Sequence, residues 1–135
     1  MEANKYAFQT TAHLCDNYSE VGHYFTCDGE GSSINTIDKL GHGGYGPNSH
    51  NTIDTTRPFS VKVDLEEKDG KLSGITTELR QGDKTTTMHN YDSNYLSHMT
   101  DALKNGQVFV ASNWSGDDTW LRKDTCTGTC SGNPL

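Results

Sequence analysis

The sequence predicts an all-β protein that folds as a single domain. Its 135 residues are enough for one hydrophobic core. Only 31% of them are hydrophobic and 14 are glycine, a composition typical of loop-rich β proteins rather than of helical bundles with long apolar stripes. Residues Phe59 to Leu65 alternate apolar and polar side chains without a break, which is the pattern of a half-buried strand.

The same patterns predict further strands. A turn at Lys68 to Lys71 should connect the first strand to an antiparallel partner over Leu72 to Leu79. A third strand is expected over Thr85 to Tyr91. Two more are expected later in the chain, a buried one over Gln107 to Trp114 and a shorter one over Thr119 to Arg122.

Two segments depart from the strand pattern. Apolar residues at helical spacing predict one short helix between Ser93 and Asn105, with Gly106 placed to end it. The stretch Gly29 to Asn51 is rich in Gly, Ser and Asn, and we expect a long loop there. Long loops on β scaffolds commonly carry function or cover another surface.

The charge balance excludes two classes of partner. The net charge is −7, and the 11 Lys and Arg residues are scattered along the chain. Nucleic acid and anionic membranes would therefore repel the protein. No apolar run approaches the length that crosses a bilayer, and the first residues lack the pattern of a signal peptide.

Other features nevertheless indicate a secreted protein. Asn17 and Asn113 each begin a sequon for N-glycosylation. The four cysteines form an even number at short separations, which outside the cell indicates disulfides. They are Cys15, Cys27, Cys126 and Cys130.

The candidate chemistry does not involve a metal or another cofactor. The six histidines show no spacing typical of a zinc site. Cys126 and Cys130 could supply two metal ligands, but no other ligands accompany them with the right spacing. Phosphate-binding loops and nucleophile elbows are also missing from the sequence.

Aromatic residues beside carboxylates and amides favour a carbohydrate cleft. Sugar rings stack on Trp and Tyr, and their hydroxyl groups bond to polar side chains. Trp114 and Trp120 lie within seven residues of each other. Burial of both tryptophans in the core is an equally open interpretation.

Short motifs along nearly the whole chain resemble, in order, the later part of the glycoside hydrolase family 7 cellulases. The motifs are Glu2-Ala3-Asn4, His13 before Cys15, Cys27-Asp28-Gly29-Glu30-Gly31, Leu40-Gly41, Tyr45-Gly46-Pro47, Ile53-Asp54-Thr55-Thr56, the strand Phe59 to Leu65, Ala102 to Val110, the two tryptophans with Leu121, and Cys130-Ser131-Gly132. The resemblance implies a concanavalin-like antiparallel β-sandwich, or jelly roll, of which residues 1–135 would be an incomplete C-terminal portion. It also implies hydrolysis of β-1,4-glucan with retention of configuration.

The resemblance assigns a role to several residues. Glu2 matches the last Glu of the family motif Glu-x-Asp-x-x-Glu and would be the acid/base, whereas the nucleophile would precede this chain. His13 matches a supporting active-site histidine. Trp114 and Trp120 match sugar-stacking residues, and Lys39 lies where a cleft arginine is replaced. We therefore expect no cellobiose release by this chain alone.

The cysteines are assigned in the same way. Cys15 and Cys27 match a bonded pair. Cys130 would be free or paired with Cys126. Ser32 stands where the family often has a cysteine, and residues 77 to 100, which should supply its partner, contain none.

Two alternatives and one simpler interpretation of Glu2 remain at this stage. The chain could be a noncatalytic lectin-like module that binds carbohydrate through Trp114, Trp120 and Tyr45. It could also be a small extracellular structural protein held by disulfides. Glu2 itself could be a solvated charge at a frayed terminus.

Overall fold

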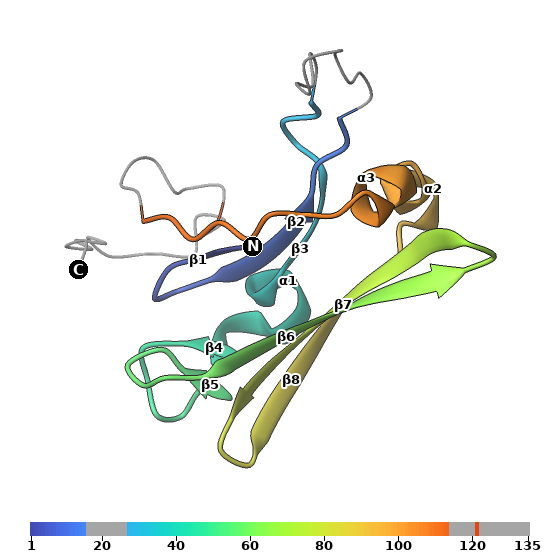
Figure 1. Ribbon diagram of the computed structural model, residues 1–135. Helices are drawn as coiled ribbons and strands as arrows, with labels where there is room; N and C mark the ends of the chain where they lie inside the picture. The colour runs from blue at the N-terminus through green and yellow to red at the C-terminus, as the bar shows by residue number, and fades with distance from the viewer. Residues whose placement is uncertain (16–26, 114–120, 122–135) are drawn as a thin grey trace.

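The structure is a computed structural model that describes residues 1–15, 27–113 and 121 (Figure 1). Two antiparallel sheets dominate it. The first has the order β1-β2-β3 and contains β1 (Glu2–Ala3), β2 (Phe8–Ala12) and β3 (Ser32–Asn35). The second has the order β6-β7-β8 and contains β6 (Ser60–Lys68), β7 (Lys71–Gln81) and β8 (Lys84–Asn90). The predicted all-β class is therefore confirmed.

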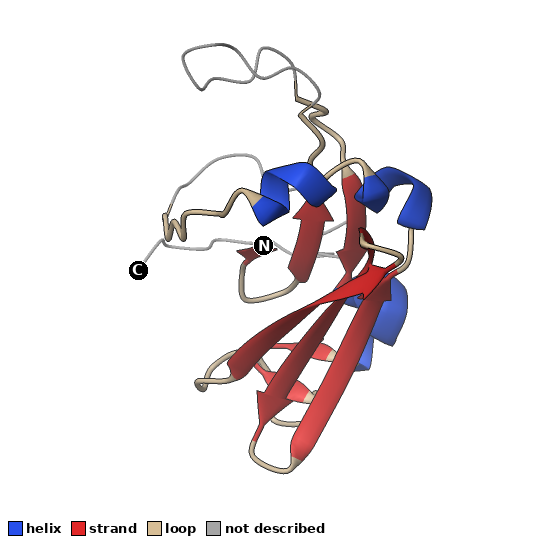
Figure 2. Cartoon of the chain, turned by 45° about the vertical axis from the view of Figure 1, so that its right-hand side comes forward, coloured by secondary structure: helices blue, strands red, loops and turns tan. Residues whose placement is uncertain are grey.

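Short elements fill the connections between the two sheets. A parallel pair joins β4 (Tyr45–Gly46) to β5 (Ile53–Asp54). The helices are α1 (Thr36–Leu40), the 3-10 helix η1 (Gly41–Gly43), α2 (Ser93–Ser97) and α3 (Thr100–Lys104). Figure 2 shows how little of the described chain is helical.

The hairpin of β6 and β7 confirms the clearest sequence prediction. Asp69 and Gly70 form its turn, with φ angles of 54° and 77°. Two consecutive residues with positive φ match the twist of antiparallel strands, which is why Asp-Gly is a strong hairpin signal. The third predicted strand is also confirmed, as β8.

The two sheets pack face to face around apolar side chains. One cluster of buried residues contains Phe8, Ile34, Tyr45, Ile53, Leu79 and Met88. A second cluster contains Ala12, Leu72, Ile75 and Leu96. Between the sheets, the buried hydroxyls of Thr10 and Thr77 bond to each other at 2.9 Å. This arrangement is part of a β-sandwich.

The prediction of a long loop over Gly29 to Asn51 is wrong for most of residues 32–46. This stretch contains β3, α1, η1 and β4. Asn35 explains the start of α1, because its side chain accepts a hydrogen bond from the Ile37 amide at 2.9 Å. A composition rich in polar residues therefore concealed a strand that pairs with β2 and a capped helix.

The predicted single helix between Ser93 and Asn105 is two helices. The chain tightens between them, since the amides of His98 and Met99 donate to the carbonyl groups three residues earlier. The Thr100 hydroxyl donates to the Ser97 carbonyl and also accepts from the Leu72 amide at 3.0 Å. Thr100, at the junction between the two helices, therefore attaches both of them to β7.

The predicted buried strand after Gly106 is also wrong for the residues described. Residues 107–113 form no strand, and the side chains of Val108, Phe109 and Val110 are 88%, 86% and 76% exposed. A strand requires a neighbouring strand, and none of the described strands pairs with residues 107–113. The strand predicted over Thr119 to Arg122 lies outside the described residues except for Leu121.

Candidate functional site

Glu2 is held in a sheet rather than in a frayed terminus. It pairs with Gln9 across the β1–β2 ladder. The turn between these strands is closed by the Asn4 side chain, which accepts from the amides of Tyr6 and Ala7 at 2.7 and 2.9 Å. Because the Tyr45 hydroxyl also donates to the Asn4 carbonyl at 3.0 Å, this turn is attached to the core.

The residues opposite Glu2 form a row of polar side chains across the first sheet. Gln9 pairs with Asn35 on β3, and paired residues of an antiparallel ladder project from the same face. The Asn35 amide donates to the Gln9 side-chain oxygen at 3.0 Å. We call Glu2, Gln9 and Asn35 the polar row. Gln9 and Asn35 are buried, so their amides are fixed in position.

The polar row has a further contact from the distant end of the chain. Asn35 also donates to the carbonyl of Leu121 at 2.8 Å, and Leu121 is 3% exposed. Leu121 therefore lies against the sheet face that carries Glu2.

His13 follows β2 on the face of the polar row, since it is two residues beyond Thr11 and four beyond Gln9. Its Nδ1 lies 2.7 Å from the Asp28 carbonyl oxygen. A carbonyl oxygen only accepts, so Nδ1 carries the hydrogen, and in that tautomer of imidazole Nε2 is an acceptor. Such a nitrogen can receive a hydrogen bond from a hydroxyl group. The His13 ring is exposed.

The carbonyl group that contacts His13 belongs to Asp28, whose side chain is held by hydrogen bonds to neighbouring groups. The Tyr95 hydroxyl donates to the Asp28 carboxylate at 2.9 Å and accepts from the Leu14 amide at 2.8 Å. Hydrogen bonds from the Gly31 backbone, from Tyr95 and from the Glu30 backbone lower the pKa of Asp28 below its usual value. Burial, more than the nearby carboxylates, raises the pKa of Tyr95.

Gly31 allows the chain after Asp28 to pass close to Ala12 and His13. Its φ is +68°, and a Cβ atom there would collide with the Ala12 carbonyl and crowd the His13 ring. The disulfide between Cys15 and Cys27 is present as predicted, and it joins the chain two residues after His13 to the residue before Asp28.

Ser32 lies against the stretch in which the family resemblance placed the partner of a cysteine. The Asn90 amide donates to the Ser32 carbonyl at 3.1 Å and to its hydroxyl at 3.0 Å. The Ser32 hydroxyl also donates to Asp92 at 3.4 Å. Hydrogen bonds therefore connect β3 to the end of β8 at the position expected for a disulfide.

Lys39 is exposed on α1 and lines an open hollow of about 420 Å³. Ser33 lines the same hollow and pairs with Thr11, so the hollow adjoins the face of the polar row. The other lining residues are Ser32, Ile34, Asp38, His89, Asn90, Tyr91 and Asp92.

Tyr45 is a core residue in place of the expected sugar platform. It is 7% exposed, and its ring lies between those of Phe8 and Phe59 at centroid distances of 6.4 and 5.8 Å. Burial raises its pKa, which keeps the hydroxyl protonated as the donor to Asn4. Because the residue is buried and its ring packs edge to face with two aromatic neighbours, the ring is not available to a sugar.

Several predicted residues lie outside the described parts of the chain. They are Trp114, Trp120, Asn17, Cys126 and Cys130. Asn113 is described and exposed, as a glycosylation site requires. Within residues 1–15, 27–113 and 121, no group of three or more His, Cys, Asp or Glu could hold a metal ion. In the same residues, no helix is long and apolar enough to cross a membrane.

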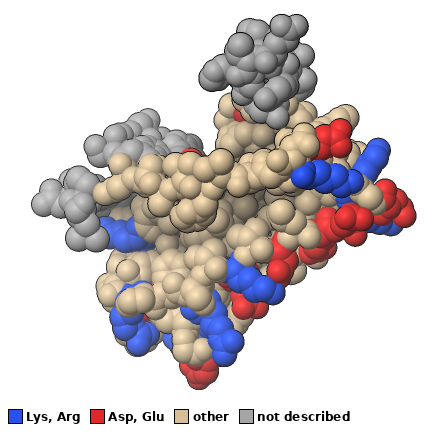
Figure 3. Space-filling view, viewed as in Figure 1, with Lys and Arg blue, Asp and Glu red and all other residues tan. Residues whose placement is uncertain are grey.

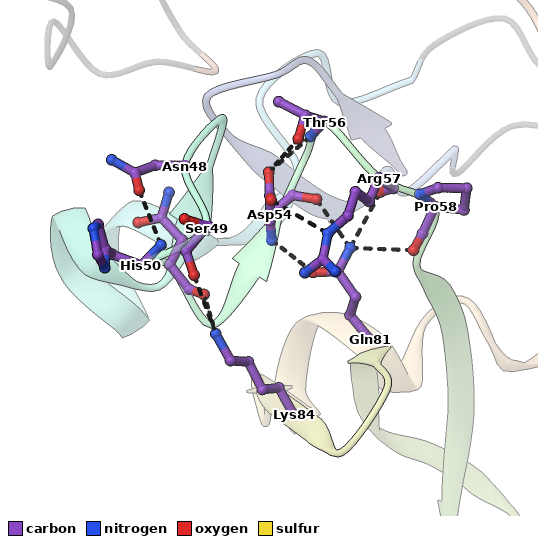
Figure 4. Close-up of polar contacts among 10 residues, drawn as sticks. Asn48, Ser49, His50, Asp54, Thr56, Arg57, Pro58, Gln81 and Lys84 are labelled. Carbon is purple, nitrogen blue, oxygen red and sulfur yellow. Dashed lines mark hydrogen bonds and ion pairs between the residues drawn. The ribbon is translucent and has the colours of Figure 1, made fainter.

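A second polar cluster was not found by sequence reasoning (Figure 4). The Gln81 side chain accepts from the Asp54 amide at 2.9 Å and donates to the Asp54 carbonyl at 2.9 Å. The Thr56 hydroxyl lowers the pKa of the Asp54 carboxylate, with smaller contributions from the Thr56 amide and Arg57. Lys84 donates to the carbonyls of Ser49 and Asn51. These bonds attach β5 and its flanking loops to β7 and β8, so this cluster is structural.

The architecture is that of a partial antiparallel sandwich with a polar face on its smaller sheet. It is similar to a solved structure of a mutant of the Humicola insolens endocellulase Cel7B (EG 1), with a TM-score of 0.63 and 20% sequence identity. It is also similar to an endoglucanase I complexed with cellobiose, with a TM-score of 0.62 and 20% identity. Each match covers 77% of this chain and 34% of the other chain.

These comparisons confirm, at the level of the fold, the resemblance to the family 7 cellulases. The chain spans about a third of the length of the endoglucanases it matches. No family model matches the sequence.

Proposed function

We propose that residues 1–135 are the C-terminal portion of a single catalytic domain from a secreted, retaining glycoside hydrolase that cleaves β-1,4-glucan. The observation that carries the proposal is the position of Glu2 and His13 on one face of a sheet, within a fold shared with endoglucanases. The disulfide and the sequons at Asn17 and Asn113 support secretion. The net charge of −7 supports a neutral ligand over nucleic acid or a membrane surface.

The proposed reaction gives a part to Glu2, to His13 and to three residues expected to contact the sugar chain. A retaining enzyme needs two carboxyl groups about 5 Å apart, one to attack the anomeric carbon and one to protonate the leaving oxygen. Glu2 would give its proton to that oxygen and later take one from water. His13 would accept a hydrogen bond from a sugar hydroxyl, and Lys39, Trp114 and Trp120 would contact the glucan.

The second carboxyl group is not in the polar row. The residues beside Glu2 in that row are the amides of Gln9 and Asn35, which bind hydroxyl groups but neither attack carbon nor transfer a proton. In the family motif Glu-x-Asp-x-x-Glu the nucleophile is five residues before the acid/base, a position that would lie upstream of Met1. We expect this chain alone to release no cellobiose from cellulose or from an aryl cellobioside.

The test is to sequence the DNA upstream of the codon for Met1 and to express the extended protein. If the protein is an enzyme, the reading frame should continue upstream and encode Glu-x-Asp-x-x-Glu ending at Glu2. In the extended protein, Glu2→Gln should abolish turnover of cellulose, because general acid help supplies about 10² to 10⁴-fold. Azide needs no general base and should restore turnover of an aryl cellobioside with a good leaving group.

The matched control is Glu67→Gln, which removes an exposed carboxylate from the far end of β6 and should leave turnover unchanged. An in-frame stop upstream, or an extended protein that tolerates Glu2→Gln, would rule out the hydrolase.

The amides of the polar row also favour a second candidate, a noncatalytic carbohydrate-binding module. Such a module would bind cello-oligosaccharides through hydroxyl contacts without cleaving them. Isothermal titration of this chain with cellohexaose separates the two candidates. Binding that is lost in His13→Ala, together with an upstream stop codon, would support the module.

A further inference from the structure

Strand β6 is an edge strand whose inward-facing apolar side chains are poorly covered. Among the described strands, the sheet order gives it β7 as its single neighbour. Val61 and Leu65 are 41% and 53% exposed, although their ladder partners Leu79 and Ile75 are 0% and 7% exposed. An exposed, regular edge of this kind presents unpaired N–H and C=O groups to another strand.

We propose that two copies of this chain associate through their β6 strands, which pair antiparallel about a two-fold axis at Val63. The pairing joins the two three-stranded sheets into one continuous sheet. The proposal concerns an edge away from the polar row and does not depend on the proposed function.

The sequence of β6 is complementary to itself in this register. Val61 lies opposite Leu65 of the second copy, so the exposed apolar side chains cover each other on one face. On the other face, Lys62 lies opposite Asp64 of the second copy, and the two-fold axis repeats this pair. Within one copy, Lys62 and Asp64 already approach to 2.8 Å. Figure 3 shows the basic and acidic side chains that lie along this hairpin.

Neighbouring registers are disfavoured by charge and by side-chain direction. An axis at Lys62 places two lysines opposite each other, and an axis at Asp64 places two aspartates opposite each other. A shift of one residue pairs charged with apolar side chains on one face. The bulge between Glu66 and Glu67 ends the regular run just where this pairing ends.

The interface is small, since it comprises Ser60 to Glu66 of each copy. Interfaces of this size belong to weak, reversible complexes. We therefore expect a dimer that forms with rising concentration, and one that high salt weakens because its charged pairs are exposed.

The test is sedimentation velocity of the oxidised full chain over about a thousand-fold concentration range. The wild type should shift from monomer to dimer. Asp64→Lys places two lysines of each strand opposite two lysines of the other copy, and Lys62→Asp does the same with aspartates. Each should weaken the dimer about tenfold or more.

Two complementation experiments identify the register. A chain carrying both Lys62→Asp and Asp64→Lys remains complementary to itself and should dimerise like the wild type. An equimolar mixture of the two single variants should form a heterodimer. The matched control, Asp83→Lys, makes the same charge change in the β7–β8 turn and should leave the dimer intact.

Circular dichroism of every variant verifies that it is folded. A wild type that stays monomeric throughout the range would overturn the proposal, as would a dimer that tolerates Asp64→Lys. A double variant that stays monomeric would also overturn it. Larger assemblies that ignore all these charges would instead indicate association through the exposed segment 107–113.

Discussion

Two apolar stretches of this chain resemble each other in sequence and differ in structure. The stretch that begins at Phe59 becomes β6, whereas residues 107–113 form no strand and leave three large apolar side chains exposed. β6 is followed by a tight turn and by β7, which supplies backbone partners along its whole length. The segment after Gly106 has no such neighbour among the described strands. An apolar, β-prone sequence therefore becomes a strand only where another strand can satisfy its backbone.

The largest expected effect is on the strand that supports β6. Leu79 is fully buried in the first core cluster and pairs with Val61. Leu79→Ala should lower the free energy of unfolding by about 2–5 kcal/mol, because it removes transfer energy and leaves a cavity. Urea unfolding measures this loss, and Thr87→Ala on the exposed face of β8 is the control, with a change within about 0.5 kcal/mol. Equal effects would mean that the hairpin is held by its turn alone.

A smaller effect is expected at that turn. Gly70 has φ of +77° and open space around its Cα, so Gly70→Ala costs backbone strain without a collision. We expect a loss of about 1 kcal/mol. Gly29 has equally open surroundings and no positive φ, so Gly29→Ala is the matched control and should be near neutral. A neutral Gly70→Ala would show that the turn does not define the register.

The next effect appears only in acid and concerns the cluster around Asp28. The pKa of Asp28 is lowered in the folded state, so its ionised form stabilises the fold above its usual pKa of 3.8. This contribution is lost as the pH falls through the lowered pKa. Thermal unfolding at about pH 6 and about pH 3 should therefore show a smaller acid-induced loss for Asp28→Asn than for the wild type.

The control for this experiment is Asp83→Asn, which changes an exposed carboxylate in the β7–β8 turn. It should keep the acid sensitivity of the wild type. If Asp28→Asn also keeps the acid sensitivity of the wild type, the link that Asp28 and Tyr95 make between the disulfide and α2 does not depend on the charge of Asp28.

The smallest effect is expected in residues 107–113. Phe109 is 86% exposed, so Phe109→Ser should change the free energy of unfolding by less than about 0.5 kcal/mol. Urea unfolding of this variant beside Leu79→Ala makes the comparison quantitative. A loss above about 1 kcal/mol would mean that residues 107–113 are packed in solution, and the contrast with β6 would disappear.

Sequence patterns predicted the parts of the fold that depend on local chemistry. Alternation and the Asp-Gly turn were sufficient for β6, β7 and β8, because side-chain direction and turn geometry are set within a few residues. The strand β3 was missed because its pairing with β2 is a long-range event in a polar sequence. The break between α2 and α3 was missed for a similar reason, since it depends on the contact of Thr100 with Leu72.

The candidate site residues were named through a family resemblance and not through spacing. Glu2 and His13 were named, and both lie on the face of the first sheet that carries the polar row. Gln9 and Asn35 were not named, because nothing local in the sequence brings two amides beside Glu2. Tyr45 was expected on the surface because its glycine-rich surroundings concealed the aromatic contacts that bury it.

The pairing of β1 with β2 has a practical consequence for handling this protein. A peptide fused in front of Met1 would enter at a sheet edge, in line with a strand, and its last residues would lie opposite Thr11 and His13. An affinity tag in that position could occupy the polar face and mimic a bound ligand. Purification and binding assays therefore call for a tag behind Leu135, or for complete removal of an N-terminal tag by a protease.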